Sequence, residues 1–172
     1  MRANLAWLLA LLCAVALACG YQFSQPHLRS LRLLLAAKPI VLSEGKPVFV
    51  EGDCFRLALF SQPDGSAQMS TSRRHDGITS NGILTTMNAQ DWSALEKGLL
   101  PLPGWREKQC DDGEPEGEAL YTLLEIETSE GKFVSQWRGL PKPQAEVANL
   151  LLGSPAGPPL RQGLTQLGLL FP

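Results

Sequence analysis

The feature that most constrains the fold of this chain is a set of segments in which apolar and polar residues alternate, each bounded by turn signals. In residues 54–60, CFRLALF, the large apolar side chains of Phe55, Leu57 and Leu59 alternate with Arg56 and Ala58. A period of two is typical of a strand with one buried face. Pro-Asp-Gly at 63–65 favours a tight turn, and residues 67–73 return after it. The pattern predicts a β-hairpin.

The second half of the chain repeats this arrangement. Residues 119–128, ALYTLLEIET, are predicted to form a strand, and residues 132–139 to form its return strand after Ser-Glu-Gly at 129–131. Leu31–Leu35 is apolar but too short for its periodicity to distinguish a strand from a helix.

Each hairpin precedes a segment with helical spacing. Asn88, followed by Asp91, is an N-cap signal for a helix near 89–99. A second helix is expected over 143–152, and a short third one near the C-terminus. The apolar positions that define the first two helices are Trp92, Leu95, Leu99, Val147, Leu150 and Leu151.

Strands that pair with their neighbours, together with segregated helices, predict an α+β fold. We expect an antiparallel sheet with two or three helices packed on one face. The hairpin–helix order in both halves is compatible with a structural repeat. The other face of the sheet is then partly exposed to solvent and available to a partner.

The N-terminus has the layout of a secretory signal. Arg2 precedes an uncharged apolar run, Leu5–Leu17, and small residues follow it. Residues 16–19, Ala-Leu-Ala-Cys, resemble the lipobox of bacterial lipoproteins. The resemblance implies that Cys19 is lipidated, becomes the mature N-terminus and anchors the protein to a membrane. An ordinary signal peptide cut near Ala18 is the alternative.

These features predict three segments: a signal peptide at 1–18, a lipid-anchored tether at 19–30 and one α+β domain at 31–172. Removing residues 1–18 from the 172-residue chain leaves 154 residues, which is enough for one domain with a hydrophobic core. In the lipoprotein family, a residue such as Gly20 after the cysteine implies sorting to the outer membrane. We therefore expect a cell-envelope location facing the periplasm, with secretion as the alternative.

Two cysteines of the predicted domain are candidates for a disulfide. Cys54 and Cys110 remain once Cys13 is assigned to the signal and Cys19 to the lipid. An oxidising compartment favours pairing. The competing interpretation is a catalytic Cys54, although its neighbours carry no nucleophile motif.

Composition excludes several function classes. The formal net charge of −2 argues against nucleic-acid binding. The chain has no nucleotide-binding, zinc-protease or Cys-x-x-Cys motif. The acidic residues 111–116 do not follow the EF-hand spacing. We expect neither a cofactor nor a metal.

The remaining expectation is a non-catalytic envelope protein that binds another protein. Arg73, Arg74 and His75 lie in the polar segment 73–82, which predicts a loop or the wide end of a hairpin. We expect these three residues to contact the partner. The alternatives are an inhibitor or immunity protein of a periplasmic enzyme, and a hydrolase that uses the 73–82 segment with His75 as its base.

Overall fold

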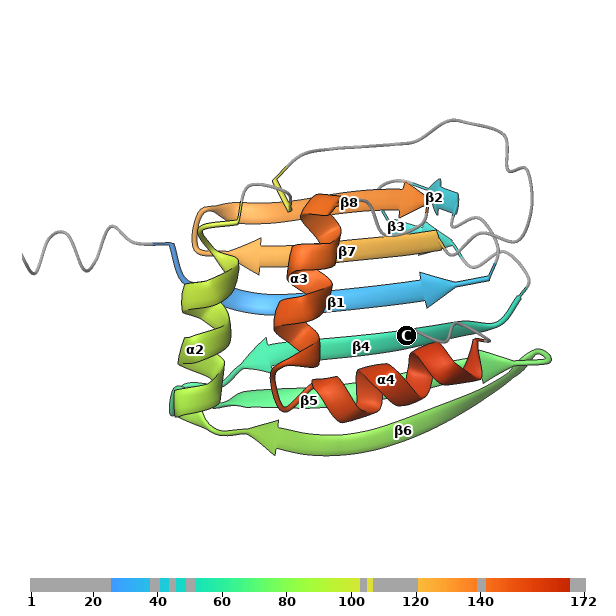
Figure 1. Ribbon diagram of the computed structural model, residues 1–172, viewed down its shortest axis with the longest axis horizontal. Coiled ribbons are helices and arrows are strands. Elements are labelled where there is room, and N and C mark those ends of the chain that lie inside the picture. The colour runs from blue at the N-terminus through green and yellow to red at the C-terminus, as the bar shows by residue number, and fades with distance from the viewer. Residues whose placement is uncertain are drawn as a thin grey trace, which may run out of the picture.

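A six-stranded antiparallel sheet lies at the centre of the computed structural model, in the order β6-β5-β4-β1-β7-β8 (Figure 1). Its strands are β1 Leu28–Ala36, β4 Cys54–Ser61, β5 Ala67–His75, β6 Ile78–Met87, β7 Tyr121–Thr128 and β8 Gly131–Arg138. A separate two-stranded sheet pairs β2 Val41–Ser43 with β3 Lys46–Val48. The structure describes residues 26–37, 41–43, 46–48, 52–102, 105–106, 121–138 and 142–167.

Strand β1 is central, although the sequence left Leu31–Leu35 open between strand and helix. It pairs with β4 on one side and with β7 on the other. Leu31 and Leu33 face the main core, whereas Leu34 belongs to a smaller apolar cluster on the opposite face. A strand buried on both faces reads as a continuous apolar run, and this explains the ambiguity. Strand β1 begins at Leu28, within the segment expected to be a tether.

Both predicted hairpins are present. Strands β4 and β5 are joined around Pro-Asp-Gly at 63–65, where Gly65 has a φ of 82°. Strands β7 and β8 form the second hairpin. Residues 73–82, expected to form a loop or the wide end of a hairpin, are instead the paired ends of β5 and β6. Only Asp76 and Gly77 form the tight turn between them, with positive φ values of 49° and 78°. Two consecutive positive φ values match the right-handed twist of a hairpin.

Three helices cover one face of the sheet: α2 Ala89–Leu99, α3 Lys142–Leu152 and α4 Gly157–Gln166 (Figure 1). The predicted α+β fold is therefore confirmed. The predicted cap is also present, since the side chain of Asn88 accepts a hydrogen bond from the backbone N–H of Asp91 at 2.9 Å. None of the helices among the described residues is long and apolar enough to cross a membrane.

The main core lies between the sheet and the helices. Trp92 and Leu95 of α2 are buried there, as are Val147 and Leu151 of α3. Leu150, predicted to be a core residue, is partly buried and packs against this core. The face of the sheet opposite the helices has no described helix over it, and the candidate site lies on that face.

Candidate functional site

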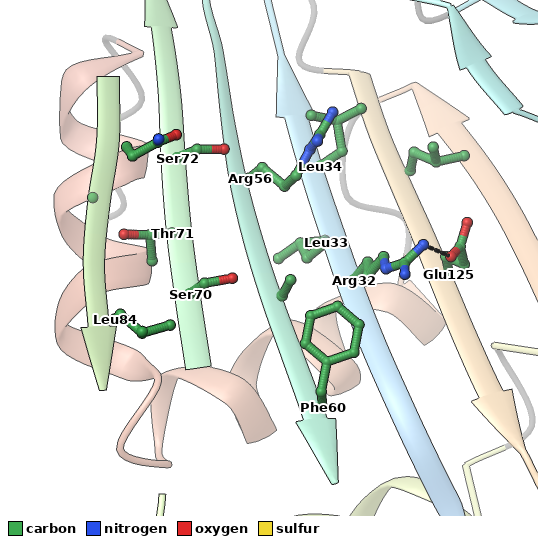
Figure 2. A pocket seen from close by; sticks show the side chains of 14 residues that line it. Arg32, Leu33, Leu34, Arg56, Phe60, Ser70, Thr71, Ser72, Leu84 and Glu125 are labelled. Atoms are coloured by element: carbon green, nitrogen blue, oxygen red, sulfur yellow. Dashed lines mark hydrogen bonds and ion pairs between the residues drawn. The ribbon is translucent and has the colours of Figure 1, made fainter. Parts of the chain in front are cut away.

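A groove crosses the open face of the sheet (Figure 2). It has a volume of about 570 Å³ and draws its lining from strands β1, β4, β5, β6 and β7. That volume is typical of a ligand or side-chain binding cleft. Its polar lining residues are Arg32, Arg56, Ser70, Thr71, Ser72, Asn81 and Glu125, and its apolar ones include Leu34, Phe60, Leu84 and Leu123.

An ion-pair network forms one wall of the groove. Arg32 and Glu125 lie directly opposite each other on β1 and β7, with Nη1 2.7 Å from Oε1. Lys132 on β8 places its Nζ 2.9 Å from the other carboxylate oxygen. The Glu125 side chain is 8% exposed, whereas the two cations are about half exposed. The guanidinium of Arg32 also lies 5.1 Å from the ring centre of Phe60, in cation–π range.

Register places further cations on the same face. Cys54 pairs with Arg74, and Arg56 pairs with Ser72, so these four side chains share one side of the β4–β5 pair. The positive charges of Arg56 and Arg74 both act on the thiol of Cys54. The groove itself is lined by two arginines and one glutamate, and that glutamate is already neutralised by two cations. Arg56 has an interaction of its own, so the charge available to a ligand comes from Arg32 and Lys132, which share one carboxylate.

Cys54 lies beside the groove in an apolar cluster with Leu34, Ala36, Tyr121 and Leu123. Its thiol is free and buried in the structure. Burial raises the pKa of the thiol, against the opposing effects of a backbone hydrogen bond from Arg74 and the nearby arginines. A thiol held in its neutral form is a poor nucleophile. Cys110 lies outside the described residues, so its disulfide with Cys54 stays a prediction.

A second polar cluster lies at the β5–β6 turn. The Nδ1 atom of His75 is 2.7 Å from Asp53 Oδ2, and its Nε2 atom is 3.5 Å from Asp76 Oδ2. The hydrogen bond to His75 lowers the pKa of Asp53. Three potential metal ligands meet here. One ligand atom from each of Asp53, His75 and Asp76 lies within 4.8 Å of the other two, and both His75 and Asp76 are exposed.

The partner residues predicted from the sequence are divided between the two faces. Strand alternation places the Arg74 side chain on the face of Cys54, outside the groove lining, and those of Arg73 and His75 on the helix side. All three residues border a separate hollow of about 150 Å³, next to Gly163 and Leu167. Ser72 lines the open groove, so its hydroxyl and the imidazole of His75, the base of the alternative hydrolase, lie on opposite faces of the sheet. The predicted lipid site, Cys19, lies outside the described residues.

The groove arginines and Glu125 did not emerge as site residues from the sequence. A signal for them existed, because Arg32 is the only charge between Ser30 and Ala37, and Arg56 interrupts CFRLALF. Single charges within apolar strands point to an exposed or ion-paired face. No family model matches the chain, and neither the curated proteins nor the solved structures contain a match.

Proposed function

We propose that this protein is a non-catalytic, membrane-anchored envelope lipoprotein that binds an acidic segment of another protein on the open face of its sheet. The observation that carries the proposal is the groove, which lies opposite all three helices and presents Arg32 and Arg56 (Figure 2). The lipobox-like N-terminus supports the membrane anchor at Cys19.

Charge complementarity supports an acidic partner segment. Among the described residues that line the groove, Glu125 is the one acidic side chain, and both Arg32 and Lys132 contact it. A carboxylate entering the groove would come close to these two cations, which share a single carboxylate between them. Arginine suits this role because its planar guanidinium can bind a carboxylate with two parallel hydrogen bonds. The apolar side chains of Phe60 and Leu84 offer contact to the rest of the segment.

The geometry favours binding over hydrolysis. A metal-independent hydrolase needs a nucleophile within hydrogen-bond reach of its base. Among the described residues, the ring of His75 contacts Asp53 and Asp76. Ser72 faces the other side of the sheet, and Cys54 packs among apolar side chains. Ser80 shares the face of His75 but lies two residues along, opposite Arg73. An inhibitor or immunity protein would use the same groove, and the identity of the captured partner separates that role from a scaffold.

Site-specific photo-crosslinking in intact cells tests the proposal. A photoreactive residue at Gln68 lies on the open face of β5, next to Phe60 in register, and one at the exposed Gln162 of α4 lies on the helix side. We expect a covalent adduct with one envelope protein from position 68 and none from position 162. Equal adducts from both positions would contradict the assignment to the open face.

Arg73 and Arg74 provide a matched pair, because they are adjacent, equally charged and on opposite faces. Arg74→Ala should weaken partner binding about two- to fivefold, as expected for an exposed charge at an interface. Arg73→Ala should leave binding unchanged. The effect of Arg74 should shrink at high salt. A cellular phenotype lost in His75→Ala, with partner binding retained, would instead favour the hydrolase.

A further inference from the structure

The edge strand β6 is the second unusual surface of this molecule. It is the outermost strand of the sheet and pairs with β5 on its inner side (Figure 1). Among the described residues, no strand pairs with its outer side. Its outward N–H and C=O groups are therefore available for backbone hydrogen bonds to another strand.

The composition of β6 lacks the charges and prolines that usually protect an edge strand. Its ten residues, ITSNGILTTM, contain no charge and no proline. Two of them are the exposed large hydrophobic residues of the described structure: Ile78 at 73% and Leu84 at 66% exposure. Natural edge strands usually carry charges or prolines that prevent pairing with other chains. The opposite edge, β8, carries the half-exposed Lys132.

A bulge in the middle of β6 directs its apolar residues to both faces. The pairing with β5 shifts register between Ser70 and Ser72, so that β6 contains an extra residue near Gly82. A side chain at Gly82 would collide with Thr71, which explains the glycine. As a result, Leu84 points into the groove, whereas Ile78 pairs with His75 on the helix side.

We propose that β6 pairs antiparallel with β6 of a second copy of this chain. A two-fold contact places the same strand opposite itself, and like charges directly opposite each other are destabilising. A strand free of charge avoids this repulsion when it pairs with itself about its own centre. This inference rests on the edge strand and is independent of the proposed partner of the groove.

The dimer joins two six-stranded sheets into one continuous sheet. The two-fold axis is perpendicular to the sheet, so both layers of helices lie on the same side. The two grooves lie on the other side and adjoin each other, because Asn81 and Leu84 of β6 form the groove margin. Leu84, near the middle of the strand, lies close to its counterpart and loses much of its exposure.

Cysteine crosslinking of the full chain in its own membranes tests this arrangement. Leu84→Cys should give a homodimer with a flexible bis-maleimide, because the two positions lie within a few residue spacings of about 3.4 Å. Glu130→Cys is the control. It lies in the β7–β8 turn, so the two copies are at opposite ends of the joined sheet, roughly 50 Å apart at about 4.8 Å per strand. The wild-type chain serves as a background control, because it shows how much crosslinking the protein's own cysteines produce.

A second pair of variants tests the edge itself. With two differently tagged copies, Thr86→Lys on β6 should abolish co-purification, whereas Gln68→Lys, the residue opposite it on β5, should preserve it. Equal crosslinking at both cysteine positions, or no homodimer from Leu84→Cys, would overturn the proposal. Loss of the groove partner through Arg74→Ala would leave the homodimer intact, so the two proposals can fail separately.

Discussion

Arg32 and Glu125 lie 93 positions apart in the chain and face each other across the β1–β7 pair, joined by a 2.7 Å ion pair. The carboxylate is nearly buried, and Lys132 approaches its other oxygen at 2.9 Å. A buried carboxylate is tolerated when cations and hydrogen bonds replace its hydration shell. The pair thus connects the stability of the sheet to the charge of the groove.

The cation pair around Glu125 should behave non-additively. Arg32→Ala and Lys132→Ala should each lower the free energy of unfolding by about 1 kcal/mol or less, because one cation remains and both are half exposed. The double variant leaves the Glu125 carboxylate without a cation. Its loss in free energy of unfolding should therefore exceed the sum of the two single losses by about 1 kcal/mol or more. Urea denaturation measures this. Adding Glu125→Gln to the double variant should recover part of the lost stability. If the losses of the two single variants simply add up in the double variant, the ion-pair network is refuted.

Gly163 should be required where helix α4 crosses the sheet. A β-carbon there would collide with the ring of Phe55 on β4. Helix propensity alone predicts that Gly163→Ala stabilises the protein by about 1 kcal/mol. The contact instead predicts a loss of about 1–3 kcal/mol through overpacking. Thermal unfolding decides the sign, and Phe55→Leu in the same chain should relieve part of the loss.

The N-cap of α2 should contribute measurably to stability. Asn88 accepts a hydrogen bond from the N–H of Asp91 and donates one to its carboxylate at 2.8 Å. Asn88→Ala should cost about 1 kcal/mol, and Asn88→Gly only a few tenths. Chemical denaturation of the two variants gives the comparison. No measurable loss in Asn88→Ala would mean that the cap hydrogen bond contributes little.

The Asp53–His75 contact predicts a small acid-dependent stability. The hydrogen bond from His75 lowers the pKa of Asp53 in the folded protein. A carboxyl group whose pKa is lowered by folding stabilises the folded state at any pH above its pKa in the unfolded chain, which is about 4. This contribution is lost as the pH falls through the pKa of the folded state. The difference in Tm between wild type and Asp53→Asn should therefore narrow below about pH 4. In a His75→Ala background the difference should be much smaller at every pH.

The membrane anchor is tested separately from the domain. Cys19→Ala should release the protein from membranes or leave it unprocessed, because the lipid is attached through this sulfur. Detergent phase partitioning of the full-length protein and the variant measures the change. Partitioning that is unaffected by the substitution would leave an ordinary signal peptide as the explanation of residues 1–18.

For the candidate site, the sequence predicted the surface but not its residues. The α+β pattern implied an open sheet face, and the groove lies there. The sequence pointed to Arg73, Arg74 and His75 together because they are neighbours in the chain. Alternation along β5 separates them, so that Arg74 alone lies on the groove side. The ion pair of Arg32 with Glu125 could not be predicted, since it depends on β1 lying next to β7.

Local chemistry in the sequence determined the elements of this protein. Alternation with a period of two predicted the two hairpins β4–β5 and β7–β8, and the Asn88 cap predicted where α2 begins. Only the tertiary structure decided that Leu31–Leu35 is a central strand, because its burial on both faces comes from strands distant in the chain. The same holds for Gly163, which weakens its helix locally yet admits the ring of Phe55. Strand order and helix placement depend on long-range packing, and short-range patterns carry no information about which strands become neighbours.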